Sequence, residues 1–345
     1  MQQVKSQGRL QWVDYARGIA IMLVVYRHVV IGARRSGFEP GALMFNIQEV
    51  FLNFRMPVFF VLSGIFVAGS LVRKSKTLVL KDRASTLLYT YLLWGGITIA
   101  LQIIFSKYTN AHRTWYDLIS IATKPREIGH LWYLLALFNT SVFFLLMSRI
   151  NIPHVLHWLL AAVMLILAKL PFLEHISVVS DLFYFYFYFL IGVTISPIIL
   201  DKERGAEMLN VKKLYWLAPL FLAAQTFWFI FRKEEHTYYF ILPFLIVNLI
   251  ACYFVYVLAN LLSRYRSNNW LSFMGRYSLY IYILHVYLAS MAKTFLLYLK
   301  PDLNIWVLVL TCTAVGLIGP IIMYNLLKGA GIDRLFSLKA KKSVA

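Results

Sequence analysis

Charged residues are scarce in this chain. They make up 14% of its 345 residues, whereas a soluble domain contains about 25%. Hydrophobic residues make up 60%, against about 45–50% in a soluble domain. These proportions exclude a mainly soluble protein and predict a multi-pass membrane protein, with little chain left for a separate soluble domain.

Cysteine is almost absent. The two cysteines, Cys252 and Cys312, both lie in apolar runs, which is typical of packing residues rather than of reactive thiols. Two such residues do not form a disulfide framework or a zinc–thiolate site. No apolar run contains two histidines four residues apart beside a carboxylate, a spacing that metal sites on helices use. We therefore expect no metal site.

Acidic residues are few as well. There are 15 Asp and Glu residues against 34 Lys and Arg, which gives a net charge of +19. Proteins that bind nucleic acid can carry such a charge, but they gather their basic residues on a polar face. Here the basic residues lie mostly in short segments between apolar runs, as the positive-inside rule describes. The expected partner is the lipid bilayer, not nucleic acid.

Apolar runs follow one another along the whole chain, each near the length of about 20 residues that a helix needs to cross a bilayer. They predict an all-α integral membrane protein, a polytopic bundle of about ten transmembrane helices. We treat residues 1–345 as a single domain with a short basic tail from about residue 328. The predicted spans are 12–32, 47–71, 86–106, 130–148, 154–171, 181–200, 214–231, 238–260, 277–298 and 303–327.

The basic residues between these spans favour one orientation. With the N-terminus inside, the inner segments carry about twice as many Lys and Arg residues as the outer loops, so the positive-inside rule places both termini in the cytoplasm. The outer loop 107–129 is long and contains Trp115 and Tyr116. We expect it to be an ordinary amphipathic loop, to lie on the membrane interface or to cover a cavity.

The first span, DYARGIAIMLVVYRHVVIG, carries four ionisable residues, Asp14, Arg17, Arg27 and His28. An Asp or Arg at the centre of a membrane helix costs about 2.5–3.5 kcal/mol. Arg17 and His28 are eleven residues apart, close to three helical turns, so they share one face about 16 Å apart along the axis. Asp14 lies one turn before Arg17 and can pair with it. This stripe should face the interior, whereas Arg27 projects about 100° away and should reach the outer interface.

Other spans also contain polar residues that belong in an interior. Arg55 lies in an apolar run, and a buried guanidinium needs an anion or a ligand. Pro57 is expected to leave a helix carbonyl without its amide partner. The other candidates for donor or substrate binding are Asn53, His130, Trp132, Tyr133, Ser278, Tyr282 and His285. For Trp132 the alternative is a place in the aromatic belt at the membrane interface.

These residue types suit acyl transfer. A neutral histidine can take the proton of an attacking hydroxyl near neutral pH. An arginine can hold a carboxylate, phosphate or pyrophosphate through two hydrogen bonds. Arg17 lies towards the predicted cytoplasmic end of the first span and His28 towards its outer half. A long phosphorylated donor that enters from inside would therefore meet an acceptor outside.

The same residues carry a resemblance to membrane acyltransferase family 3. The first-helix signature of that family is an arginine followed, after ten intervening residues, by a histidine, and Arg17 and His28 have this spacing. The segments FRMPVFFVLSG, HLWYLLALF and YSLYIYILH resemble the second-helix motif, the His/aromatic motif and the late Ser/Tyr/His segment of the family. The resemblance covers essentially the whole chain, and four motifs in order are far more specific than one spacing.

The resemblance implies transfer of an acyl group, usually acetyl, from cytoplasmic acetyl-CoA to a carbohydrate hydroxyl. The acceptor would be a cell-envelope glycan or its lipid-linked precursor at the bacterial inner membrane. By the same resemblance His28 is the catalytic base or a transient acyl carrier, Arg17 supports the donor or the histidine, and Asp14 orients Arg17. Acyl-CoA would be a substrate, and no permanently bound cofactor is expected.

Two alternatives stay open. A secondary transporter or flippase would use the buried arginine and histidine as an ion path, although the sequence contains no evident inverted repeat. The same fold could also use succinyl-CoA or an amine acceptor, with Arg55 or Arg27 near the succinyl carboxylate. The sequence does not identify the acceptor glycan, the modified hydroxyl, the oligomeric state, or whether transfer is direct.

Overall fold

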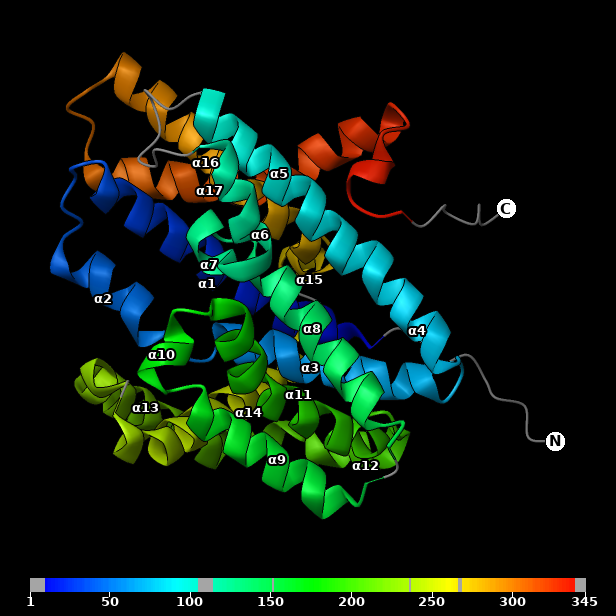
Figure 1. Ribbon diagram of the computed structural model, residues 1–345. Coiled ribbons are helices and arrows are strands. Elements are labelled where there is room, and N and C mark those ends of the chain that lie inside the picture. The colour runs from blue at the N-terminus through cyan, green and yellow to red at the C-terminus, as the bar shows by residue number, and fades with distance from the viewer. Residues whose placement is uncertain (1–9, 105–113, 151, 236, 266–268, 339–345) are drawn as a thin grey trace.

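The computed structural model describes residues 10–104, 114–150, 152–235, 237–265 and 269–338. Within these ranges every regular element is a helix, and no strand occurs (Figure 1). The all-α prediction is therefore confirmed. Four of the predicted inner segments and the outer loops 107–129 and 232–237 include residues that lie outside the described ranges, among them Lys5, Arg9 and 107–113.

Within the described residues, eight helical segments are long and apolar enough to cross a membrane. They are α1 Gln11–Arg35, α2 Ala42–Val50 with α3 Arg55–Leu71, α4 Lys76–Arg83 with a π-helical turn Ala84–Leu88 and α5 Tyr89–Ile104, α11 Ser177–Ile199, α12 Lys202–Met208 with α13 Leu214–Phe231, α14 Ile241–Tyr265, α16 Ser278–Leu299 and α17 Ile305–Gly329. The smaller helices are α6 Ser120–Thr123, α7 Pro125–Ile128, α8 Trp132–Met147, α9 His154–Leu167, α10 Pro171–Glu174 and α15 Asn269–Arg276.

Helices α8 and α9 are apolar but shorter, with 16 and 14 residues. At a rise of 1.5 Å per residue they are about 24 and 21 Å long, less than the roughly 30 Å of a bilayer core. The predicted count of ten spans requires both helices to cross, and that count and the sidedness of the termini stay predictions.

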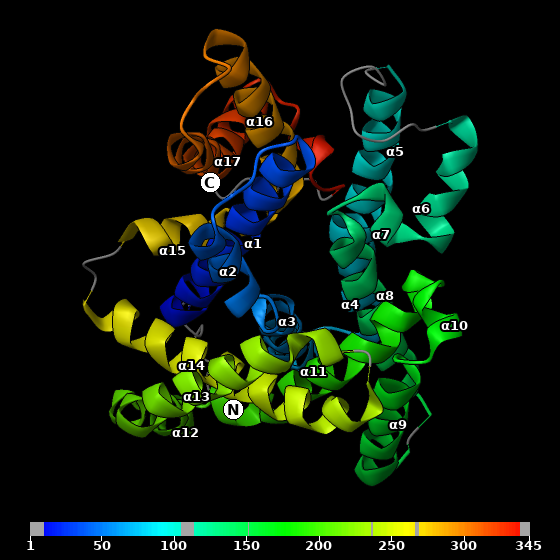
Figure 2. The ribbon, with the colours of Figure 1, turned by 90° about the vertical axis from the view of Figure 1, so that its left-hand side faces the viewer.

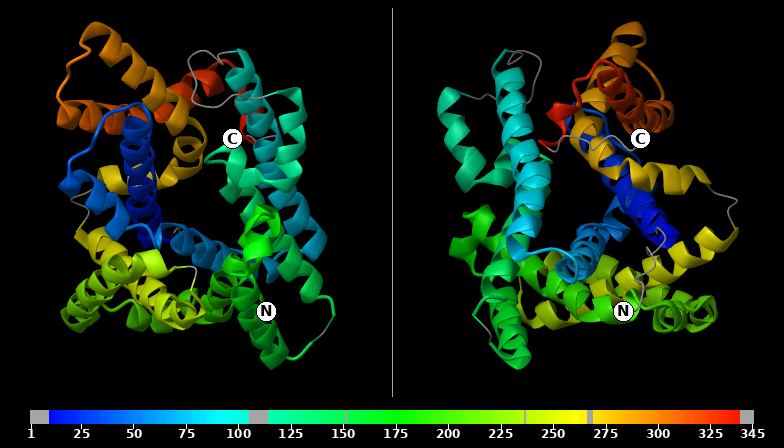
Figure 3. Two further views of the ribbon diagram at one scale, coloured as in Figure 1. Left: turned by 60° about the vertical axis from the view of Figure 1, so that its left-hand side comes forward. Right: turned by 90° about the vertical axis from the view of Figure 1, so that its right-hand side faces the viewer.

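The helices form two groups joined along one edge. Figure 2 shows α1, α2, α15, α16 and α17 on one side and α4 to α10 on the other, with α3, α11, α13 and α14 connecting them. At the opposite edge, the segment that follows α17 connects the two groups (Figure 3). Thr90 Oγ1 and Trp94 Nε1 of α5 donate hydrogen bonds of 2.9 Å to the carbonyls of Phe336 and Leu335 in this segment. The basic tail begins after α17, and residues 339–345 lie outside the described ranges.

The span predicted at 47–71 is not continuous. Helix α2 ends at Val50, a turn follows, and α3 begins at Arg55. Pro57 therefore lies in the first turn of α3, where amides have no helical acceptor and a proline leaves no carbonyl unpaired. The expectation of a carbonyl freed by Pro57 was wrong for this reason.

Helix α15 was not predicted, and it crosses α1 at very close range (Figure 2). A Cβ atom added at Gly18 would lie 2.2 Å from the carbonyl oxygen of Leu271, and one at Gly275 would lie 1.7 Å from that of Asp14. Only glycine allows the two backbones to approach in this way. The contact fixes the predicted cytoplasmic half of α1 in the bundle.

Helices α3 and α11 approach each other equally closely. A Cβ atom at Gly64 would lie 2.1 Å from the carbonyl oxygen of Phe189, and one at Gly192 would lie 2.0 Å from that of Val61. Beside this contact the rings of Phe60 and Phe185 stack with centroids 4.2 Å apart. The aromatic run of α11 is therefore packed inside the bundle on this face.

We predict that Gly192→Ala destabilises the protein, because the added methyl overlaps the backbone of α3. Overpacking of this kind costs about 1–3 kcal/mol, so the thermal unfolding midpoint of the purified protein in detergent should fall. Gly96→Ala in α5 is the matched control, since no atom lies within 4 Å of its added Cβ and alanine favours helix. An unchanged midpoint for Gly192→Ala would contradict the α3–α11 contact.

Candidate active site

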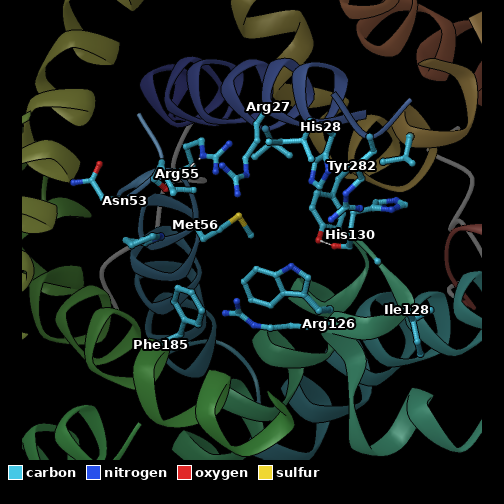
Figure 4. A pocket seen from close by; sticks show the side chains of 18 of the residues that line it. Arg27, His28, Asn53, Arg55, Met56, Arg126, Ile128, His130, Phe185 and Tyr282 are labelled. Carbon is cyan, nitrogen blue, oxygen red and sulfur yellow. Dashed lines mark hydrogen bonds between the residues drawn. The ribbon is translucent and has the colours of Figure 1, made fainter. Parts of the chain in front are cut away.

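A cavity of about 1360 Å³ lies between the two groups of helices. Six of the candidate residues line it: His28, Asn53, Arg55, His130, Trp132 and Tyr282. Figure 4 shows five of them: His28 on α1, Asn53 and Arg55 before and on α3, His130 just before α8, and Tyr282 on α16. By area the wall is mainly apolar, so the cavity presents a few polar and charged side chains among apolar ones.

Three histidine rings meet at one end of this cavity, where His28 and His130 line the wall and His285 is fully buried and does not line it. The His28 ring centroid lies 5.1 Å from that of His285 and 6.0 Å from that of His130, and the latter two are 5.0 Å apart. The three residues come from α1, the segment before α8, and α16, so only the tertiary structure brings them together. In the described part of the chain, no group of three His, Cys, Asp or Glu residues has the arrangement of a metal site.

Backbone carbonyls determine where two of these rings carry their protons. His130 Nε2 lies 3.0 Å from the carbonyl oxygen of Ile283, and His285 Nδ1 lies 2.8 Å from those of Ile281 and Tyr282. A carbonyl only accepts, so these nitrogens are the donors. In a neutral ring the other nitrogen keeps its lone pair. His285 Nε2 is buried and has no hydrogen-bond partner in the described part of the chain.

The hydroxyl of Tyr282 holds His130 in place from the other side. It donates a hydrogen bond to the backbone carbonyl of His130. Its ring packs against Tyr133, with centroids 5.2 Å apart. Tyr133 itself contacts Phe60 (5.4 Å) and is absent from the cavity wall, so its position supports Tyr282.

The three residues predicted to share one interior face of the first helix, Asp14, Arg17 and His28, do not all line the cavity. His28 lines the cavity, but Asp14 is buried where α1 meets α15, and the Arg17 guanidinium lies 5.5 Å from the ring centre of Phe66 on α3. Helices pack around α1 on several sides, and they separate positions that share a face in an isolated helix. Ser278, at the start of α16, is also absent from the cavity wall.

Arg27 was expected at the outer lipid interface, and that expectation was wrong. It lines the cavity, donates a hydrogen bond to Gln48 Oε1 and lies 3.5 Å from Glu49 Oε1. The cause is α2, which returns against α1 and presents Gln48 and Glu49 to this arginine. Glu49 also pairs with Arg232 at 3.3 Å, so one carboxylate serves two guanidinium groups.

Arg126, in the outer loop 107–129, is a cavity residue that the sequence analysis missed. Its Nε and Nη2 atoms donate to Asp181 Oδ1 at 2.8 and 2.5 Å, and its guanidinium lies 4.3 Å from the ring centre of Trp132. An aspartate in the apolar span 181–200 was the available signal. Arg126 and Ile128 line the cavity, so this end of the loop contributes to the cavity wall, as Trp132 does.

A second pair of cations lies away from the cavity. Arg83, at the end of α4, interacts electrostatically with Arg17 and with the hydroxyl group of Tyr133. Neither arginine lines the cavity. In the sequence, Arg83 belongs to a basic segment between two predicted spans, and the positive-inside rule alone accounts for a basic residue there.

Comparison with known proteins identifies the family. A family model described as an acyltransferase domain, that of acyltransferase family 3, matches residues 10–325. The chain belongs to this family. The match includes α1 with Arg17 and His28, the α3 segment, the α8 segment and α16, so the resemblance seen in the sequence is confirmed. A multi-pass membrane protein is supported by the family and by the helices together.

Two curated proteins with the same name are similar to this chain. Nodulation protein NolL of Sinorhizobium fredii (strain NBRC 101917 / NGR234) is 27% identical over 203 residues, which cover 58% of this chain and 52% of the relative. Nodulation protein NolL of Mesorhizobium japonicum is 26% identical over 181 residues, covering 52% and 46%. The chain thus spans about half the length of the curated relatives it matches. No solved structure matches it significantly.

We predict that the Arg126–Asp181 ion pair stabilises the protein. The Asp181 side chain is 2% exposed, and a hydrogen bond to a charged group contributes about 1.5–3 kcal/mol. Asp181→Asn should lower the unfolding midpoint, and a double-mutant cycle with Arg126→Met should give a favourable coupling energy. Lys124→Met is the control: it breaks the exposed Lys124–Glu127 pair and should change nothing measurable. A coupling energy of zero would contradict the pair.

Proposed function

We propose that this protein is an integral membrane O-acyltransferase of the bacterial inner membrane. It transfers an acyl group, acetyl in the first instance, from cytoplasmic acyl-CoA to a hydroxyl of an extracytoplasmic glycan or its lipid-linked precursor. The observation that carries the proposal is His28, a family-motif histidine that lines a large cavity and lies beside two further histidines. The partners would be acyl-CoA, a carbohydrate acceptor and the lipid bilayer.

His28 supplies the base that the reaction needs. A neutral imidazole takes the proton of the acceptor hydroxyl while the hydroxyl oxygen attacks the carbonyl carbon of the thioester. The tetrahedral intermediate then loses the CoA thiolate by cleavage of the carbon–sulfur bond, and protonated His28 returns the proton to that sulfur. In the second route His28 attacks the thioester itself and carries the acyl group to the hydroxyl. Trapping of radiolabelled acetyl on the protein without acceptor distinguishes this route from direct transfer.

His285 and His130 orient the base in this proposal. The His285 ring is held by two carbonyls through Nδ1, which leaves the Nε2 lone pair available beside His28. If His28 donates its own N–H to that lone pair, its second nitrogen becomes the acceptor for the hydroxyl proton. His285 and His130 would therefore be positioning residues, and Tyr282 would support His130.

The donor would approach from the other end of α1. Arg83 is near enough to Arg17 for the two charges to interact, and arginines suit the pyrophosphate of coenzyme A. Arg17 is about 16 Å from His28 along the axis. A donor extended along α1 could therefore reach the histidine while its phosphates stay with the arginines. The inward bias of basic residues supports a cytoplasmic position for this end.

We predict that His28→Ala abolishes glycan acylation. The loss of the base should lower the rate by at least about 10²–10⁴-fold, and mass spectrometry of envelope polysaccharides from the variant strain should show a missing acetyl group. His175→Ala is the matched control, because His175 is exposed outside the cavity. Normal acylation in a His28→Ala strain with normal protein levels would overturn the proposal.

The transporter alternative is tested with the purified protein in liposomes. Acetyl transfer or thioester hydrolysis without net movement of solute supports the enzyme, as the family match does. Solute flux that depends on His28 without release of CoA would favour the transporter instead.

We predict that Arg17→Met raises the KM for acetyl-CoA. Loss of a charge-assisted contact to a phosphate group, worth about 1.5–3 kcal/mol, should raise the KM roughly tenfold or more and change kcat little, because the contact is present in the ground state as well. Release of CoA thiol from the purified protein measures both constants. Arg149→Met, at an exposed position, is the control. A fall in kcat at constant KM would instead give Arg17 a role in chemistry.

A further inference from the structure

Positive charge gathers on the wall of the cavity. Its cationic lining residues are Arg27, Arg35, Arg55, Arg126 and Lys169. Three of these have a carboxylate partner, in the pairs Arg27–Glu49 (3.5 Å), Arg126–Asp181 (2.5 Å) and Lys169–Glu235 (3.5 Å). Arg35 is exposed and can be hydrated. Arg55 is the member of this set that is buried without a carboxylate.

The surroundings of Arg55 leave its charge uncompensated. The residue is 5% exposed. Its Nε donates to the carbonyl oxygen of Leu52 at 3.4 Å and its Nη1 to that of Leu23 at 3.2 Å. These carbonyls carry no charge, and no described carboxylate lies within ion-pair distance of the guanidinium. An unpaired cation buried among apolar helices is costly, and the remaining donors of the guanidinium have no protein acceptor in the described part of the chain.

A second guanidinium increases this cost. Figure 4 shows Arg27 and Arg55 approaching each other from α1 and α3 at the edge of the cavity. The two charges repel, and Glu49 only partly offsets them because it also pairs with Arg232. His28, His130 and Tyr282 lie further along the same cavity (Figure 4). An anion between the two arginines would thus lie in the chamber that contains the proposed base.

We propose that Arg55, with Arg27, binds an anionic group of the acyl acceptor, a carboxylate or a phosphate. The acceptor is then an acidic carbohydrate or a phosphate-linked carbohydrate rather than a neutral one. This inference rests on the proposed function, which supplies the acceptor and the role of His28. Arginine suits both anions, because its planar fork matches carboxylate and phosphate oxygens.

The position of the cavity assigns the anion to the acceptor and not to the donor. On α1 the lining begins at Val24 and ends at Arg35, and on α16 it runs from Tyr282 to Tyr298. Arg17 and Arg83, which would hold the phosphates of the donor, do not line it. The cavity therefore extends from His28 towards the predicted outer end of both helices, where an extracytoplasmic acceptor would enter.

Two pairs of probes that differ only in charge test the proposal. One pair is tetragalacturonic acid and its methyl ester, and the other is undecaprenyl phosphate and undecaprenol. Binding to the purified protein is measured without acetyl-CoA. We expect the charged member of at least one pair to bind the wild-type protein about tenfold or more tightly, the size of one charge-assisted contact. The pair that shows the preference identifies a carboxylate or a phosphate as the recognised group.

The variants locate the preference at Arg55. Arg55→Met should bring the charged and neutral probes of that pair to within about twofold of each other, and Arg55→Lys should retain part of the preference. Arg149→Met is the control and should keep the wild-type preference. Each variant must elute as a single species on gel filtration, and Arg55→Lys keeps the test decisive if Arg55→Met does not fold.

Three results would overturn the inference. The first is equal binding of charged and neutral probes in both pairs, and the second is a preference for the charged probe that survives in Arg55→Met. The third is an Arg55→Met variant that loses affinity for acetyl-CoA instead, because that result would assign the anion to the donor. Failure of the proposed function is detected separately. If no acceptor causes His28-dependent release of CoA, the acyltransferase assignment is wrong even where charged probes bind preferentially.

Discussion

The cost of burying charge among apolar helices constrains the interior of this protein. A cation there needs a carboxylate, a hydrated cavity or a ligand. Asp181 meets this need for Arg126, Glu49 for Arg27 and Arg232, and Glu235 for Lys169. These pairs join helices and loops that are far apart in the sequence, and they surround one cavity. The ion pairs therefore define the wall of the site as well as stabilising it.

Close backbone contacts fix α1, which carries the proposed base His28, relative to this wall. Gly18 and Gly275 let α15 cross α1 without intervening side chains, and Gly316 of α17 leaves only 2.9 Å between an added Cβ and Val25. With α1 held on these sides, His28 has little freedom to move away from His285 on α16. The geometry of the histidine cluster thus depends on small residues that have no chemical role of their own.

The cavity and the two groups of arginines suggest that the donor and the acceptor bind at separate cationic regions. Arg17 and Arg83 form one cationic region, Arg27 and Arg55 form another, and His28 belongs to the second, whose chamber it lines. In the proposed reaction each region holds the anionic part of one substrate, and the acyl group passes between them at the histidine. Charge that would otherwise be costly in a membrane thereby becomes a means of binding two substrates.

The sequence by itself determined the class of fold, most helix positions and the family, because apolar runs of membrane length and four ordered motifs are local features. It also identified His28, Arg55, His130, Trp132 and Tyr282, which line the cavity. It did not predict the break between α2 and α3, helix α15, or the cavity positions of Arg27 and Arg126. Those features depend on contacts between distant segments. Helix α2 packs against α1, so that Glu49 pairs with Arg27, and Asp181 of α11 pairs with Arg126. Helical periodicity places a side chain on one face of its helix, but only the packed helices decide whether that face meets lipid, a neighbour or the cavity.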